Sequence, residues 1–85
     1  MIIKDRKKFI ENFLQRYCEN KKLDAKFWYS KFINNTLYIR IRPSHSISDF
    51  SFSSDIDFNK ESISFILRRI ISDIKKNYEA FTKKN

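Results

Sequence analysis

The chain has 85 residues, with 18 Lys or Arg against 10 Asp or Glu, and carries a net charge of +8 at pH 7. Its length predicts one domain over residues 1–85, and its positive charge favours acidic partners such as nucleic acids. It contains no glycine, which excludes the P-loop, the Rossmann turn and the nucleophile elbow, because each of these motifs requires glycine.

The first predicted element is a helix from Ile3 to Glu19. At 100° per residue, its apolar side chains fall within one half of the helical wheel, and several charged side chains fall on the other half. The apolar half consists of Phe9, Ile10, Phe13, Leu14, Tyr17 and Cys18. Asn20, Lys21 and Lys22 are typical of a helix end, because cations complement the negative end of the helix dipole.

A β-hairpin is predicted from Ala25 to Arg42, because two apolar-aromatic runs flank the polar pair Asn34-Asn35. The second run alternates with the period of a half-buried strand, and its inward side chains are Leu37, Ile39 and Ile41. With a two-residue loop, the outward face carries Phe27, Tyr29, Lys31, Tyr38, Arg40 and Arg42. With a three-residue loop, it carries Lys26, Trp28, Phe32, Tyr38, Arg40 and Arg42. The sequence leaves both registers open.

A third strand is predicted from Phe50 to Phe58, after Pro43 ends the hairpin. Ser54 interrupts its alternation, so a bulge or a break is expected there. A last helix follows, with Asn59 as its predicted N-cap. The apolar stripe of this helix contains Ile63, Ile66, Leu67, Ile70, Ile71, Ile74, Tyr78 and Phe81. The opposite side carries Phe65, Arg68, Arg69, Ser72 and Lys76.

The predicted element order is therefore α-β-β-β-α. It indicates an α+β fold of two layers, in which a three-stranded antiparallel sheet carries both helices on one face. Double-stranded-RNA-binding domains use the same order. Their glycine- and histidine-bearing loop is replaced here by Asn34-Asn35, and their lysine cluster is reduced to Lys60. The similarity is one of topology, and no family is assigned from it.

The outward face of the hairpin suggests a function, since it combines aromatic rings with arginines. Such a face suits stacking on bases and contact with phosphates. We expect a small, non-catalytic protein that binds RNA or DNA and needs no cofactor. The predicted contact residues are Tyr29, Lys31, Tyr38, Arg40 and Arg42 of the hairpin, and Phe65, Arg69 and Lys76 of the last helix.

Two alternatives remain open at this point. The same residue types are enriched at protein–protein hot spots, so the chain could be an inhibitor that binds a host nuclease or a CRISPR-type nucleoprotein. A phage or mobile-element origin (an anti-CRISPR protein) agrees with the many residues whose codons are AT-rich. Alternatively, the aromatic rings only stabilise the sheet. In that case the arginines pair with Asp49, Asp55 or Asp57. A free edge strand or the Phe65 side of the helix would also support a homodimer.

The sequence predicts neither a catalytic nor a metal site. His45 is the sole histidine, and a general base at this position, near Asp49, would have no second partner fixed by spacing. Cys18 is the sole cysteine, and Cys18 with His45 matches no zinc spacing. Because a lone thiol suits a reducing compartment, and no apolar run is long enough for a secretory signal or a membrane span, we expect a cytoplasmic protein.

Overall fold

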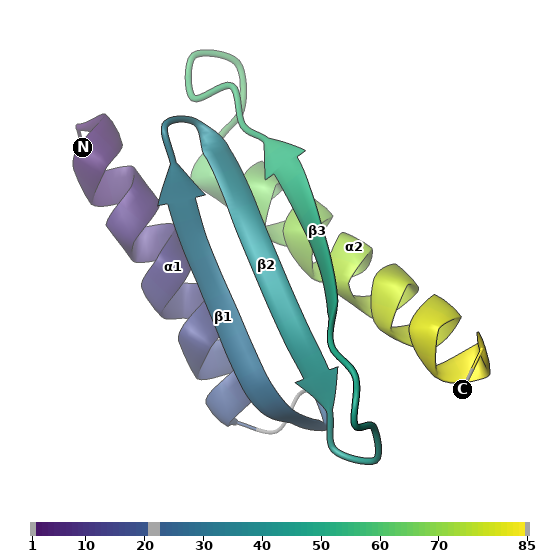
Figure 1. The fold of residues 1–85 in the computed structure, drawn as a ribbon. Helices are drawn as coiled ribbons and strands as arrows, with labels where there is room; N and C mark the ends of the chain where they lie inside the picture. The colour runs from purple at the N-terminus through teal and green to yellow at the C-terminus, as the bar shows by residue number, and fades with distance from the viewer. Residues whose placement is uncertain (1, 21–22, 85) are drawn as a thin grey trace.

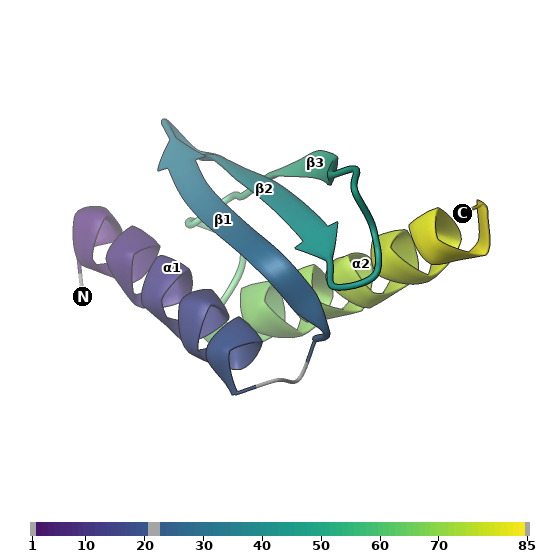
Figure 2. The same cartoon turned by 60° about the horizontal axis from the view of Figure 1, so that its bottom comes forward.

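The structure, a computed structural model, describes residues 2–20 and 23–84. Its elements are α1 (Ile3–Glu19), β1 (Ala25–Ile33), β2 (Thr36–Pro43), β3 (Phe50–Asp55) and α2 (Ile63–Lys84). The strands form one antiparallel sheet in the order β1-β2-β3. Both helices lie on the same face of this sheet (Figures 1 and 2). The predicted α+β fold and its α-β-β-β-α order are confirmed, whereas Lys21 and Lys22 of the predicted helix end lie outside the described residues.

The hairpin has the two-residue loop. Tyr29 pairs with Arg40, and Lys31 pairs with Tyr38, so these four side chains lie on one face of the sheet. Asn34 takes a positive φ of 55°, a conformation that asparagine tolerates better than most residues. The loop therefore fixes the register, and with it the set of aromatic rings that points away from the helices.

The core lies between the sheet and the two helices. Its fully or almost fully buried side chains come from three elements: Leu37, Ile39 and Ile41 of β2, Ile10 and Leu14 of α1, and Ile66, Ile70 and Ile74 of α2. Burying one such side chain contributes about 1.5–3 kcal/mol. The aliphatic side of β2 thus packs in one core with both helices, and no described element covers the other face of the sheet.

The buried stripe of α1 is narrower than the sequence predicted. Only Ile10 and Leu14 are buried, while Phe9 and Phe13 are 46% and 40% exposed. The helix contacts the sheet along β1 and meets α2 over only a short stretch (Figure 2). Consequently, none of the described elements covers the side of α1 that carries these two phenylalanines.

The segment between β3 and α2 also differs from the prediction. The strand ends at Asp55, and the helix begins at Ile63, so Asn59 is not its N-cap. Ser62 has this role, because its Oγ accepts a hydrogen bond from the Phe65 backbone N–H at 3.2 Å. The intervening turn is instead held by Asp57, whose backbone carbonyl accepts from the N–H of Glu61 at 2.9 Å.

Candidate functional site

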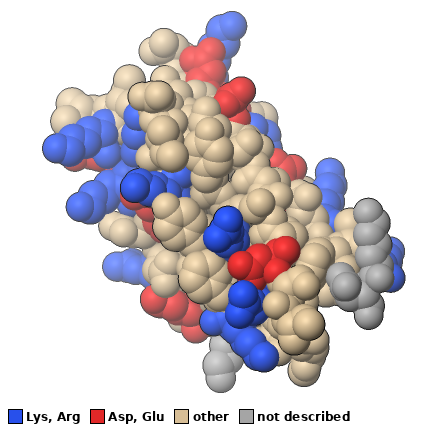
Figure 3. Space-filling view, in the orientation of Figure 1, with Lys and Arg blue, Asp and Glu red and all other residues tan. Residues whose placement is uncertain are grey.

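The face of the sheet opposite the helices is open to solvent. We call it the open face; it comprises Phe27, Tyr29, Lys31 and Ile33 of β1, Thr36, Tyr38, Arg40 and Arg42 of β2, and Ser51, Ser53 and Asp55 of β3. All of these side chains are exposed except Thr36, which is half-buried. Figure 3 looks onto this face and shows Lys and Arg side chains standing among uncharged ones.

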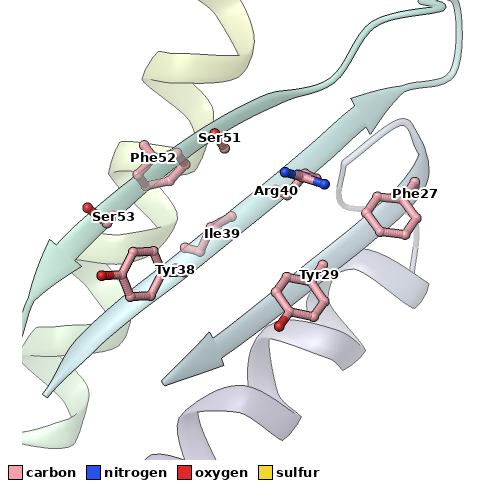
Figure 4. A pocket seen from close by; sticks show the side chains of 8 residues that line it. All are labelled: Phe27, Tyr29, Tyr38, Ile39, Arg40, Ser51, Phe52 and Ser53. Atoms are coloured by element: carbon pink, nitrogen blue, oxygen red, sulfur yellow. The ribbon is translucent and has the colours of Figure 1, made fainter. Parts of the chain in front are cut away.

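A shallow hollow lies at the centre of the open face (Figure 4). Phe27 and Tyr29 border it on β1, Tyr38 and Arg40 on β2, and small serine side chains on β3. Phe27, Tyr29 and Tyr38 are 43–44% exposed, so nearly half of each side chain remains available to a ligand. The hollow therefore combines three accessible aromatic rings with one guanidinium group.

Register places Arg40 among these three rings. It stands directly opposite Tyr29, two residues from Tyr38 along β2, and diagonally across from Phe27, which pairs with Arg42. Residues two apart on a strand share a face and are separated by about 6.6–6.8 Å. A group bound at Arg40 would thus be within reach of all three rings.

The two arginines of β2 differ in their electrostatic surroundings. Arg42 Nε donates to Asp49 Oδ1 at 2.6 Å, which largely neutralises its charge. Within the described part of the chain, no ion pair is found for Arg40 or Lys31. The alternative interpretation of the sequence, in which the arginines of β2 pair with aspartates, thus holds for Arg42. It fails for Arg40, whose charge remains available to a ligand.

The three predicted contact residues of α2 do not share the open face, because α2 packs on the opposite face of the sheet (Figure 2). Phe65 is 53% exposed, and Lys76 is exposed as well. Arg69 was expected beside them, but it is half-buried: its Nη1 donates to Ser54 Oγ at 2.8 Å, and its Nη2 lies 2.7 Å from Glu61 Oε1. Arg69 therefore links α2 to the sheet.

Sequence reasoning missed three residues of the open face that line the hollow. Ser51 and Ser53 carried no signal of their own, and their place follows from their pairing with Arg40 and Tyr38. Phe27 was recognised only as one outcome of the two-residue loop and was not among the predicted contact residues. The Asn34-Asn35 pair was the signal that would have selected it.

The two edges of the sheet differ. On the outer side of β1, Glu11 Oε2 of α1 accepts a hydrogen bond from the Phe32 backbone N–H at 2.8 Å. β3 forms the opposite edge and pairs only with β2 within the sheet. Its six residues include neither proline nor lysine, the residues that commonly protect such edges. The free edge strand that the sequence suggested as a dimer contact is thus β3.

The surroundings of His45 do not resemble a catalytic triad. His45 Nε2 lies 3.6 Å from Asp24 Oδ2, and the imidazole is 93% exposed. The Ser44 hydroxyl donates to Asp24 rather than to the imidazole.

Cys18 is half-buried in α1, and burial together with the neighbouring Glu19 carboxylate raises the pKa of its thiol. The thiolate, which is the nucleophilic and metal-binding form, is thereby disfavoured. Among the described residues, no group of three or more His, Cys, Asp or Glu side chains is arranged to hold a metal ion.

Comparisons with protein-family models, with curated proteins and with solved structures found no match to this chain. In the described ranges, neither helix combines the length and the apolar character needed to cross a membrane.

Proposed function

We propose that this protein binds nucleic acid through its open face. The observation that carries the proposal is the position of Arg40, which forms no ion pair with the described residues, among three exposed aromatic rings. Aromatic rings stack on bases of any sequence, and a guanidinium binds phosphate oxygens through two parallel hydrogen bonds. The expected mode is therefore binding with little sequence preference.

The two unpaired cations of the open face, Arg40 and Lys31, set the expected electrostatic contribution. Each phosphate neutralised on a single strand contributes about −0.7 to the slope of log K against log salt concentration. Two contacts give a slope of about −1.4, which corresponds to an affinity loss of about sevenfold between 50 and 200 mM salt. The lysines of α1 would steepen this dependence if the ligand extends past β1.

A protein partner is the second candidate, favoured by a separate observation. Phe65 is 53% exposed on α2, and the cations of Arg68 and Lys76 lie exposed on the same helix. Aromatic and arginine side chains are common anchors of protein interfaces. An inhibitor of a host nuclease or of a CRISPR-type nucleoprotein would use this side of the molecule. For either function we place the protein in the cytoplasm, where the lone Cys18 stays reduced.

Charge-matched variants test the first candidate. Lys31→Gln with Arg40→Gln removes two cations from the open face, whereas Arg68→Gln with Lys75→Gln removes two exposed cations from α2. Fluorescence anisotropy with labelled DNA and RNA oligonucleotides, at several salt concentrations, measures affinity and slope for each protein. The first pair should lose most of the binding and nearly all of the salt dependence.

The α2 pair should bind almost as the original protein does, because its cations lie on the far layer. Equal losses in both pairs would mean that only net charge matters, and the open face would then not be the binding site. Binding that survives the first pair unchanged would remove the proposal. In that case, capture of a protein partner that fails after Phe65→Ala would support the second candidate.

A further inference from the structure

We propose that the open face selects single-stranded over double-stranded nucleic acid, by stacking three unstacked bases on Phe27, Tyr29 and Tyr38 around a phosphate held by Arg40. This inference rests on the proposed function and adds the class of ligand. The observation that carries it is the register of Phe27, Tyr29 and Tyr38, which sets how far apart their positions lie along and across the strands.

The three rings are too far apart for stacked bases. Phe27 and Tyr29 are separated by about 6.6–6.8 Å along β1, and Tyr38 lies on the diagonal from Tyr29 at about 7–8 Å. Successive bases of one strand in a duplex are about 3.4 Å apart, and their faces cover one another. Only bases that have left the stack can each meet a ring of this set.

A duplex would meet the open face only through its phosphates. Its base faces are hidden, so the rings would contribute nothing beyond contact with sugars. A single strand adds stacking to the same phosphate contacts, and each stacked base contributes about 5- to 150-fold in affinity, which is about 1–3 kcal/mol. Three rings therefore give a large preference for single strands even if not every ring is occupied.

Arg40 is placed to bind the backbone that links the stacked bases. It is opposite Tyr29, next to Tyr38 on the same strand, and it carries no ion pair within the described residues. Ser51 and Ser53 on the neighbouring strand are small, and Phe52 between them, which also lines the hollow, pairs with the buried Ile39 and so belongs to the helix-covered face (Figure 4). A strand can therefore pass over Arg40 without meeting a bulky side chain there.

The test compares three ligands of equal length: oligo-dT, the dT·dA duplex, and an abasic strand that keeps every phosphate and lacks bases. A parallel set of oligo-rU and its duplex shows whether DNA and RNA behave alike. We expect the single strand to bind at least tenfold more tightly than the duplex. The abasic strand should bind as weakly as the duplex does.

Variants separate stacking from charge. Tyr29→Leu and Tyr38→Leu should each lower single-strand affinity by about 5- to 150-fold and leave duplex affinity unchanged. Arg40→Gln should weaken both ligands, and the control Phe13→Leu, which alters an exposed aromatic ring of α1 on the helix side of the sheet, should weaken neither. A thermal melt of each variant verifies that the fold is retained.

Failure of this inference can be told apart from failure of the proposed function. Equal affinity for single strand, duplex and abasic strand would overturn single-strand selection while leaving nucleic-acid binding in place. Equal losses for both ligands in the tyrosine variants would overturn it as well. Absence of binding to every ligand at low salt would overturn both proposals together.

Discussion

The Arg42–Asp49 ion pair should limit nucleic-acid binding at one end of the open face, and this can be tested by mutation. The two groups are 2.6 Å apart, with side chains 44% and 26% exposed, so a ligand phosphate at Arg42 must compete with the carboxylate. Asp49→Asn removes that competitor and keeps an oxygen that accepts a hydrogen bond. One more phosphate contact should then form, and the slope should steepen from about −1.4 to about −2.1. Between 50 and 200 mM salt, this change corresponds to a further factor of about 2.6 in affinity.

Two further variants complete the measurement, again by anisotropy over a salt series. Arg40→Gln should make the slope shallower by about 0.7, because the lost cation has no internal partner. The double variant Asp49→Asn with Arg42→Gln replaces an ion pair of zero net charge by two uncharged amides. It should therefore bind like the original protein. Melting temperatures should change little, since an exposed ion pair contributes about 0–1 kcal/mol.

The refuting result is equally specific. If Asp49→Asn leaves both affinity and slope unchanged while Arg40→Gln weakens binding, a ligand does not reach the Arg42 end of the open face. If Arg40→Gln also has no effect, the difference between a paired and an unpaired arginine has no bearing on binding. The electrostatic reasoning would then be wrong.

Three further predictions concern stability. In α2, Phe65→Ala should change the free energy of unfolding by less than about 0.5 kcal/mol, because Phe65 is exposed. Ile66→Ala should lower it by about 2–5 kcal/mol, because Ile66 is fully buried. Equal changes for both variants in urea unfolding would contradict the packing of α2. Ser62→Ala should cost about 1 kcal/mol, visible as a lower melting temperature, and an unchanged melt would mean that the cap does not form in solution. Burial raises the pKa of Cys18 and Tyr78, so the unfolded chain loses these protons first, and stability should fall as the pH rises above about 8.5. Urea midpoints measured from pH 7 to pH 10 should show a smaller first part of this decline for Cys18→Ala than for the original protein. An identical decline in both proteins would contradict a contribution of Cys18.

The parts of the fold that depend on local pattern were predictable from the sequence. The bounds of α1 follow from its helical period, and β2 follows from strict alternation between Leu37 and Arg42. The pair Asn34-Asn35 indicated a short loop, although only the structure selects the two-residue register. Such features are decided by residues that are neighbours in the chain, and for that reason a single sequence contains them.

Features that depend on distant contacts were not predictable. Periodicity places Phe13 with Leu14 on one side of α1, but which of them is covered depends on how far β1 and α2 extend over the helix. Likewise, Asn59 and Ser62 are both good N-caps by residue type. The choice between them is made where β3 ends and where Asp57 turns the chain.

Arg69 shows most clearly why residue type and helical position are not enough to assign a binding residue. On the helical wheel it lies on the same side as Lys76. Ser54, however, is a polar residue among the apolar inward side chains of β3, and its hydroxyl needs a hydrogen-bond partner. Arg69 supplies that partner and is held in turn by Glu61, so the polar residue on the inward side of the continuous strand β3 and the basic residue on the helix form one interaction. The same reasoning separates Arg40 from Arg42. A cation is available to a ligand only where the fold leaves its charge uncompensated, and on the open face this condition is met beside the aromatic rings.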